Sequence, residues 1–303
     1  MSISVLIATA DRPDELAATL RSLAACQIPT ASFEVLVADN GGGDQSATVC
    51  REASANLNIH YVDVSERGKT KALNQAIEQA KGELIVFTDD DVQFDPGWLA
   101  ALWNASQDYP EHVLFGGRVT PMWPNGCPEH LTGSRYLGPL YTLLDRGDTA
   151  GPLPEFRPFG PNMAVVRSVF EGGVQFDEAI GPGSTMGVSM GDESEFARQL
   201  EARGQTAVYV PSAEVYHRIR QEQLTLRWQL ERGLLYGRML AYFDGDAHAH
   251  ARLGFPRWIV RSVVSGVLSA GWHAARGRRR VAFDRLFDAS VAAGQGQKSR
   301  QGR

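Results

Sequence analysis

Four short apolar segments, each paired with a helical pattern, constrain the fold of this chain more than any other feature of its sequence. Residues 3–9 (ISVLIAT) form a near-continuous apolar run, as expected for a strand covered on both faces. Further strands are expected at 34–39, 59–64 and 84–88, with helices from Pro13, after the turn at 40–44, and over 69–81. This alternation predicts an α/β fold with a Rossmann-like, mostly parallel central sheet flanked by helices. Ligands of such sheets bind beyond the carboxyl ends of the strands.

The second half of the chain shows weaker patterns. Between residues 121 and 161, proline, glycine and aromatic residues are intermixed without periodicity, which fits a functional loop region and an ordinary insertion equally well. Beyond it we expect a strand at 163–167, a helix over 192–203, and strands at 206–210 and 213–217. A chain of 303 residues forms one large domain or two. We expect one domain over 1–240 and a basic helical extension over 241–303.

Charge is distributed unevenly along the chain. The formal net charge is −5, yet residues 255–303 hold ten Lys and Arg against two Asp and Glu, a net +8 that leaves −13 for the rest. An apolar stripe at helical spacing lies within this basic segment and is followed by four arginines: Val260, Val263, Val264, Val267, Leu268 and Trp272, then Arg276, Arg278, Arg279 and Arg280. This pattern predicts a helix lying in a membrane interface, its arginines on anionic headgroups. The alternative is a helix packed on the protein with a solvated basic end. No nucleic acid is expected as a partner, since no recognition fold accompanies the charge.

Several protein classes are disfavoured by what the sequence lacks. Three cysteines without metal-type spacing argue against a disulfide framework and against a cysteine-based zinc site. The N-terminal residues lack the basic region of a signal peptide, and no run of about 18 apolar residues could span a bilayer. We therefore expect a cytoplasmic protein whose C-terminal tail contacts the inner-membrane surface peripherally.

Asp89, Asp90 and Asp91 directly follow the fourth predicted strand. Three adjacent carboxylates repel one another unless a cation or hydrogen bonds compensate. Because side chains alternate along an extended segment, we expect Asp89 and Asp91 to converge on one site. Carboxylate oxygens suit Mg²⁺ or Mn²⁺, which would bridge phosphate oxygens. The alternative is a solvated loop in which Asp95 caps a helix begun by Pro96; we adopt the cap for Asp95 and the metal for the triplet.

Five further side chains could take part in chemistry. Asp192 and Glu193 open a predicted helix, where acids are favoured by the dipole and where one of them could act as a general base. His217 could join two carboxylates as a metal ligand, although a lone histidine is more often structural. Lys69 and Lys71, at a helix start, could face phosphates or lie on the solvated surface.

The ordered set of these motifs resembles that of the family 2 glycosyltransferases. ISVLIATADRPDEL, EVLVADNGGGD, GKTKALNQAI and GELIVFTDDDVQFDPGWL are similar to the nucleotide-binding half of that family. GPNMAVVRSVF, GDESEFARQLEARG and VYVPSAEVYH are similar to its acceptor half. The resemblance covers about residues 2–240 and implies a GT-A fold, with a nucleotide-binding half at 1–120 and an acceptor half at 121–240. It also implies transfer of a sugar from a nucleoside diphosphate, usually with inversion.

The resemblance assigns roles to single residues. It implies that Asp39 reads a uracil ring and that Asp91 binds the metal as the last residue of a DXD motif. The family's Gly-Glu-Asp is Gly-Asp-Glu here, which puts Glu193 in the position of the base and keeps Asp192 as the alternative. The family's nucleoside-stacking tyrosine is Ala10 in this chain. The full set of expected contacts is Thr9, Asp11, Arg12, Asp39, Lys71, Asp89 and Asp90 for the donor, Asp89, Asp91 and His217 for the metal, and Glu193 or Asp192 for the acceptor hydroxyl.

We therefore expect a metal-dependent, inverting glycosyltransferase of the hexosyltransferase type. Its cofactor would be Mn²⁺ or Mg²⁺, its donor a nucleoside-diphosphate sugar, a UDP-sugar first, and its acceptor a hydroxyl-bearing glycan, lipid-linked or small molecule. Nucleotidyl transfer on a similar fold would need a glycine-rich basic phosphate loop where ATADRPDE stands. A degenerate nucleotide-sugar-binding or scaffolding protein is the non-enzymatic alternative, which the intact carboxylates disfavour.

Overall fold

The structure, a computed structural model, describes residues 2–30, 32–184, 187–244 and 257–301. Packing divides the chain into two compact units. The first consists of Met1–Pro121, Leu144–Gly187 and Gly191–Arg218, and the second of Met122–Leu143, Val188–Met190 and Ile219–Arg303.

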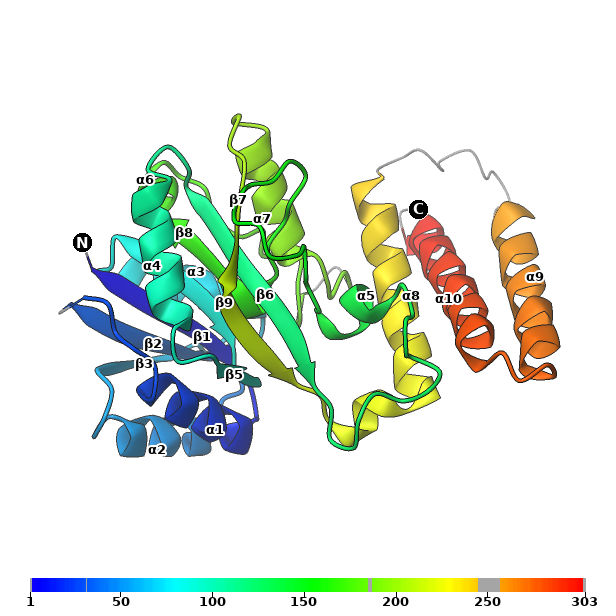
Figure 1. The fold of residues 1–303 in the computed structure, drawn as a ribbon, viewed down its shortest axis with the longest axis horizontal. Coiled ribbons are helices and arrows are strands. Elements are labelled where there is room, and N and C mark those ends of the chain that lie inside the picture. Colours follow the sequence, from blue (N-terminus) through cyan, green and yellow to red (C-terminus); the bar gives the residue numbers. More distant parts are fainter. Residues whose placement is uncertain (1, 31, 185–186, 245–256, 302–303) are drawn as a thin grey trace. The chain divides into compact units, whose positions relative to one another are not determined.

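A mixed sheet forms the centre of the first unit (Figure 1). Its strands are β1 (Ile3–Thr9), β2 (Phe33–Asp39), β3 (Ile59–Asp63), β4 (Leu84–Asp89), β5 (Val92–Phe94), β6 (Leu114–Met122), β7 (Gly151–Pro152), β8 (Met163–Val166) and β9 (Val208–Arg218). They lie in the order β3-β2-β1-β4-β8-β6-β9-β5, with β7 beside β9. The pairs among β1 to β4 are parallel, whereas β8 joins β4 and β6, and β9 joins β5 and β7, in antiparallel fashion. The predicted α/β fold with a central sheet and flanking helices is confirmed, with the parallel part confined to the N-terminal strands.

Helices cover this sheet because its first strands are apolar on both faces. Every residue of β1 except Ala8 is buried. The covering helices are α1 (Pro13–Ala24), α2 (Asp44–Ala53), α3 (Lys69–Gln79), α4 (Trp98–Asp108), α6 (Ser168–Glu171) and α7 (Asp192–Glu201). Helix α1 packs against α2, α3 packs against β1 and β2, and α4 packs against β9 (Figure 1). Parallel register places Thr9 opposite Asp39 and Ala8 opposite Asp89, so polar strand ends meet at one edge of the sheet.

The second half of the chain differs in detail from the sequence-based expectations. The strands predicted at 206–210 and 213–217 form the single strand β9, which passes through Pro211. Strand β7 pairs with β9 at Val208 and Tyr209, and β5 pairs with it from Val215. Pro211 therefore lies between these two pairings, where a missing N–H costs least. The region 121–161 contains the short elements α5 (Leu137–Tyr141) and β7, and a 3-10 turn (Gly160–Asn162) begins at its end.

Asp95 does not cap a helix begun by Pro96, as had been expected. Helix α4 begins at Trp98 and its N-cap is Gly97, whose backbone N–H donates to Asp95 Oδ1 at 2.8 Å. Asp95 thus closes a turn ahead of the helix, because a short acidic side chain readily accepts a hydrogen bond from the backbone two residues on.

The second unit is helical. It contains α5, α8 (Leu226–Phe243), α9 (Arg257–Ala274) and α10 (Arg279–Gln301), and α10 packs against both α8 and α9. Its core consists of Leu131, Leu140, Tyr141, Ile219, Phe283 and Phe287. Helix α9 confirms the helix expected from the apolar stripe in the tail. Among the described helices, none combines the length and the apolar character that crossing a bilayer requires.

Candidate active site

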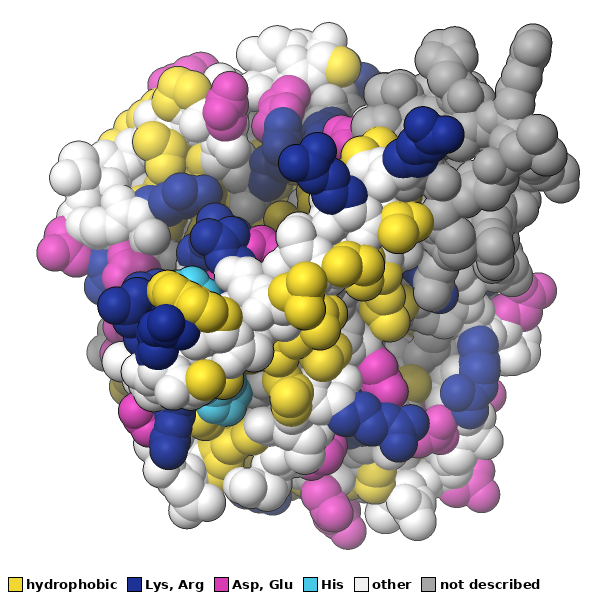
Figure 2. Space-filling view, turned by 90° about the vertical axis from the view of Figure 1, so that its right-hand side faces the viewer, with side chains coloured by type: hydrophobic (Ala, Val, Ile, Leu, Met, Phe, Trp, Pro, Cys, Tyr) yellow, Lys and Arg dark blue, Asp and Glu magenta, His cyan; other side chains and the backbone are white. Residues whose placement is uncertain are grey.

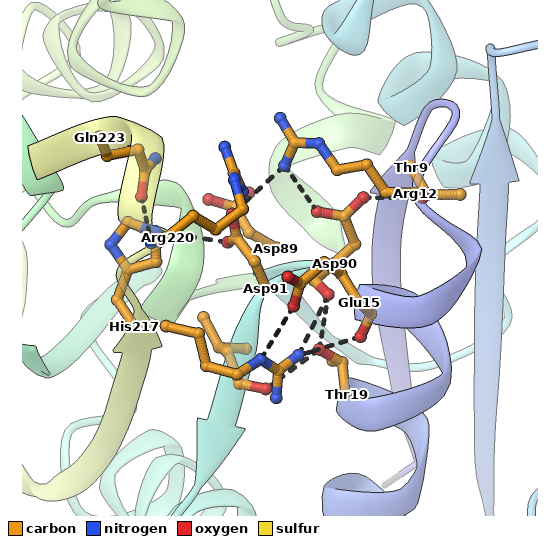
Figure 3. Close-up of polar contacts among 12 residues, drawn as sticks. Thr9, Arg12, Glu15, Thr19, Asp89, Asp90, Asp91, His217, Arg220 and Gln223 are labelled. Carbon is orange, nitrogen blue, oxygen red and sulfur yellow. Dashed lines mark hydrogen bonds and ion pairs between the residues drawn. The ribbon is translucent and has the colours of Figure 1, made fainter. Parts of the chain in front are cut away.

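Two of the three aspartates at the end of β4 share a partner, because Arg12 Nη1 lies 3.1 Å from Asp90 Oδ1 and 3.2 Å from Asp91 Oδ2 (Figure 3). Asp89 ends the strand, but Asp90 and Asp91 form a turn into β5, so the alternation that had suggested convergence of Asp89 and Asp91 does not apply. Asp90 is 4% exposed and accepts hydrogen bonds from Thr9 Oγ1 at 2.7 Å and from Arg12 at 3.1 Å. Burial and the neighbouring Asp91 raise the pKa of Asp90, against the effect of Arg12. Asp90, expected as a donor contact, therefore ties the turn to β1 and to the start of α1.

Asp91 lies beside His217, and strand pairing places them there. Val92 is opposite His217 in the antiparallel pair of β5 and β9, so the residue just before β5 meets the end of β9. His217 Nε2 is 3.4 Å from Asp91 Oδ1, and both side chains are buried. Within the described ranges, no group of three or more His, Cys, Asp or Glu side chains is arranged to hold a metal ion. The structure brings together two of the three expected metal ligands, while Asp89 pairs with Lys69.

Lys69 links the aspartate triplet to the helix α7. Its Nζ lies 2.9 Å from Asp89 Oδ1 and 3.0 Å from Glu193 Oε1. Lys71, which had been expected to contact the donor, pairs instead with Glu66. Successive helical residues are rotated by about 100°, so two lysines two positions apart face nearly opposite directions. The sequence places both lysines at the start of one helix, and only the tertiary structure shows that Lys69 is the one that faces the carboxylates.

Asp192 and Glu193 occupy the first turn of α7 after Gly191, a left-handed N-cap residue. Burial raises the pKa of Asp192, as does repulsion from Glu193, and its Oδ2 has no hydrogen-bond partner in the described structure. Burial acts in the same direction on Glu193, but the ion pair with Lys69 outweighs it and lowers the pKa of Glu193. The Asp192 residue is 3% exposed, whereas the Glu193 side chain is 14% exposed. Of the two acids, Glu193 is thus the ionised and more accessible one.

The turn at residues 160–162 packs directly against the Glu193 carboxylate. A Cβ at Gly160 would lie 2.2 Å from Glu193 Oε1, so the carboxylate occupies the space that a side chain would take. Asn162 is fully buried and fixes the loop by accepting a hydrogen bond from Trp98 Nε1 at 2.8 Å and donating one to Ala213 O at 2.7 Å. Glu193, the candidate base, therefore lies against a turn that the hydrogen bonds of Asn162 hold in place.

Asp11 and Asp39 follow β1 and end β2 at the same sheet edge. Asp39 is 1% exposed, and its two oxygens accept hydrogen bonds from the Gly41 backbone N–H at 2.8 Å and from Tyr61 Oη at 3.0 Å. Asp11 is exposed, has a left-handed φ of 55° and pairs with Arg67 at 3.1 Å. Both residues lie where a nucleoside is expected, since this edge carries the carboxyl ends of the parallel strands.

Comparison with known sequences finds a family match over the N-terminal half of the chain, which includes Asp39, Lys69 and the Asp89–Asp91 triplet. The model of the family described as glycosyl transferase family 2 matches residues 4–164. The succinoglycan biosynthesis protein ExoM of Rhizobium meliloti is 25% identical over 260 residues, which cover 80% of this chain and 76% of that protein. The poly(ribitol-phosphate) β-N-acetylglucosaminyltransferase TarS of Staphylococcus aureus is 31% identical over 154 residues, 47% of this chain and 26% of that protein.

Solved structures show the same fold. The mannosyltransferase PcManGT of Pyrobaculum calidifontis, solved with GDP-Man and Mn²⁺, matches with a TM-score of 0.63 and 18% identity over 96% of this chain and 86% of that one. Residues 1–349 of S. aureus TarS, solved with UDP, match with a TM-score of 0.55 and 16% identity over 100% of this chain and 92% of that one.

Proposed function

Because the chain belongs to glycosyl transferase family 2 and is a glycosyltransferase of the hexosyltransferase type, we propose that it transfers a hexose from a nucleoside-diphosphate sugar to a hydroxyl acceptor, with inversion at the anomeric carbon. The observation that carries the proposal is the position of Glu193. This ionised carboxylate starts a helix beside Asp89 and Lys69, which lie at the carboxyl end of the central sheet.

In the proposed reaction, a Glu193 oxygen takes the proton of the acceptor hydroxyl. The acceptor oxygen then forms a bond to the anomeric carbon while the bond from that carbon to the diphosphate oxygen breaks, and the electron pair leaves with the nucleoside diphosphate. Lys69 keeps Glu193 ionised before the step, because its ammonium group favours the carboxylate form. Gly160 and the loop behind it keep the carboxylate in place, so little reorganisation is needed when the acceptor binds.

Asp91 and His217 are suited to hold a divalent ion. They offer a carboxylate oxygen, Asp91 Oδ1, and an imidazole nitrogen that face each other at 3.4 Å, while Asp91 Oδ2 is paired with Arg12 at 3.2 Å. Mg²⁺, and by analogy Mn²⁺, often takes one or two protein ligands and completes its shell with substrate phosphates and water, so two side chains suffice. When bound there, Mn²⁺ or Mg²⁺ would neutralise charge on the departing diphosphate. We assign Asp89 to the donor site, where it shares Lys69 with Glu193.

We propose a UDP-sugar as the first donor to test and a glycan or lipid-linked acceptor. TarS structures contain UDP and UDP-GlcNAc, whereas the PcManGT structure contains GDP-Man, so proteins with this fold bind uracil or guanine nucleotides. Asp39 is the carboxylate proposed to read uracil. A related Haloferax volcanii enzyme is named a glucosyl-dolichyl phosphate glucuronosyltransferase, which supports a lipid-linked acceptor as one candidate.

The decisive experiment is a donor screen. The purified chain is incubated with UDP-, GDP- and dTDP-sugars in Mn²⁺, and release of the nucleoside diphosphate is followed with and without candidate acceptors. We expect donors of one nucleotide class to be cleaved, and we expect the nucleoside diphosphate to be released faster in the presence of an acceptor. Tight donor binding without cleavage of any donor, under every acceptor tried, would contradict the proposal.

A further inference from the structure

Helix α9 turns its large apolar side chains away from the protein. Leu268 is 70% exposed, Val260 and Val264 are 52% exposed, and Val267 and Trp272 are 50% exposed. They follow one another at intervals of four, three, one and four residues, which places them along one side of the helix. A surface helix ordinarily buries such residues and exposes polar ones, so an outward apolar ridge of this length needs a partner.

The inward side of α9 explains why the ridge cannot be turned toward the core. Ile259, Gly266 and Ala270 are its buried residues, and two of these are small. A Cβ at Gly266 would lie 2.9 Å from Ala289 Cβ and 3.0 Å from Arg285 O, so α9 and α10 approach each other closely through this side. A larger residue does not fit there, and the apolar ridge faces outward as a consequence of the packing.

Basic side chains surround the ridge. Residues 257–280 contain six arginines and no Asp or Glu. Among the described side chains, Arg257, Arg261, Arg276 and Arg278 are exposed and have no carboxylate partner in this part of the structure. The Arg276 guanidinium lies 3.7 Å from the centre of the Trp272 ring. Figure 2, which views the molecule from the side of α9, shows a band of hydrophobic side chains with Lys and Arg side chains at its margins.

We propose that this ridge docks on an anionic lipid membrane, with α9 lying in the plane of the interface. The apolar side chains would enter the boundary between headgroups and acyl chains, and the four unpaired arginines would meet lipid phosphates. Tryptophan is favoured at that depth, where its ring is apolar and its N–H stays hydrated. A nucleic acid could pair with the arginines, but it would leave the exposed valines and Leu268 in water. A second copy of the chain would cover the apolar side chains, but it would bring its arginines close to those of the first copy.

The test is co-sedimentation of the full chain with phosphatidylcholine vesicles that contain or lack phosphatidylglycerol. We expect binding to the anionic vesicles and little to the neutral ones. Leu268→Ser should weaken the partition about tenfold, because most of a leucine side chain no longer leaves water. Arg276→Gln combined with Arg278→Gln should weaken it about 25-fold, or about fivefold for each arginine near the surface.

Matched controls distinguish vesicle binding by this surface from nonspecific vesicle binding and from the effects of misfolding. Ile28 is 40% exposed and Arg51 and Arg203 are exposed, all in the other unit, so Ile28→Ser and the pair Arg51→Gln with Arg203→Gln should bind vesicles like the wild type. The Leu268 and arginine variants alter exposed side chains on and just after α9, and they should keep the wild-type melting temperature and the transfer rate to a soluble acceptor.

Three results would overturn the proposal. The first is equal pelleting of wild type, Leu268→Ser and the double arginine variant. The second is loss of oligonucleotide binding in the arginine variants with vesicle binding unchanged, which would indicate a nucleic-acid surface. The third is a change of mass in analytical ultracentrifugation caused by Leu268→Ser without any effect on vesicles, which would indicate self-association.

Discussion

Replacing Glu193 by Gln removes the proposed base while disturbing little else. The amide has nearly the same size and still offers an oxygen to Lys69 Nζ, which lies 3.0 Å from Glu193 Oε1. Gly160 has no side chain, so the space that the Glu193 carboxylate occupies beside it also accommodates the glutamine amide. The helix start, the loop and the fold are therefore expected to persist, so that the loss of a proton acceptor is the main change.

The expected loss follows from the chemistry that the carboxylate performs. General-base assistance is worth about 10² to 10⁴ in rate, which corresponds to about 2.7 to 5.4 kcal/mol of barrier. Because Glu193 is proposed to act in the transfer step, kcat should fall by this factor while the KM for the donor changes less. The assay is release of nucleoside diphosphate under saturating donor and acceptor, with donor affinity measured by calorimetry on the same preparation.

Glu195→Gln is the matched control. Glu195 lies in the same turn of α7 and accepts a hydrogen bond from Gln199 at 2.7 Å, so its replacement removes an equal charge near the same helix start. We expect it to retain near-wild-type kcat. If Glu193→Gln retained near-wild-type turnover with normal donor affinity, Glu193 could not be the base. Asp192→Asn would then become the variant to measure.

Three further predictions follow from the site and its support. Asp91→Ala should remove the Mn²⁺-dependent part of UDP binding measured by calorimetry, and a titration unchanged from wild type would rule out this residue as a metal ligand. Lys69→Met should shift the acidic limb of the pH–rate profile upward, because the lysine lowers the pKa of Glu193 and the base works only when ionised; an unmoved limb would contradict that coupling. Asn162→Ala should lower the free energy of unfolding in urea by about 3 kcal/mol, since the buried Trp98 N–H loses its acceptor, and a change below about 1 kcal/mol would show that the loop is not held this way.

The first strands could be predicted from sequence because each is a near-continuous apolar run between helical segments. Strand β1 has the bounds expected, and β2, β3 and β4 differ by one residue at an end. Strand β6 was not expected, since its Gly116, Gly117 and Pro121 are typical of turns. The break predicted within β9 had the same origin in Pro211, whose effect depends on which neighbouring strands pair beside it.

The site was predictable to the extent that strand ends bring residues together. The carboxylates at the ends of β2 and β4 lie where parallel strands finish, which pattern and topology alone imply. Partner choice was not predictable in the same way. Asp89 pairs with Lys69, and Asp90 turns inward, because a turn replaces the extended segment assumed for the triplet. The exposed ridge of α9 was visible in sequence as a stripe, but only packing shows which side of the helix is covered.

The contact between Gly160 and Glu193 has a consequence for how sequences of this kind can vary. A β-carbon at position 160 would push the carboxylate off Lys69, while a shorter acid at position 193 would leave a gap above the glycine. Neither position can therefore change freely by itself. The residue at position 160, remote in the chain, would therefore limit the length of the acid that is proposed to act as the base.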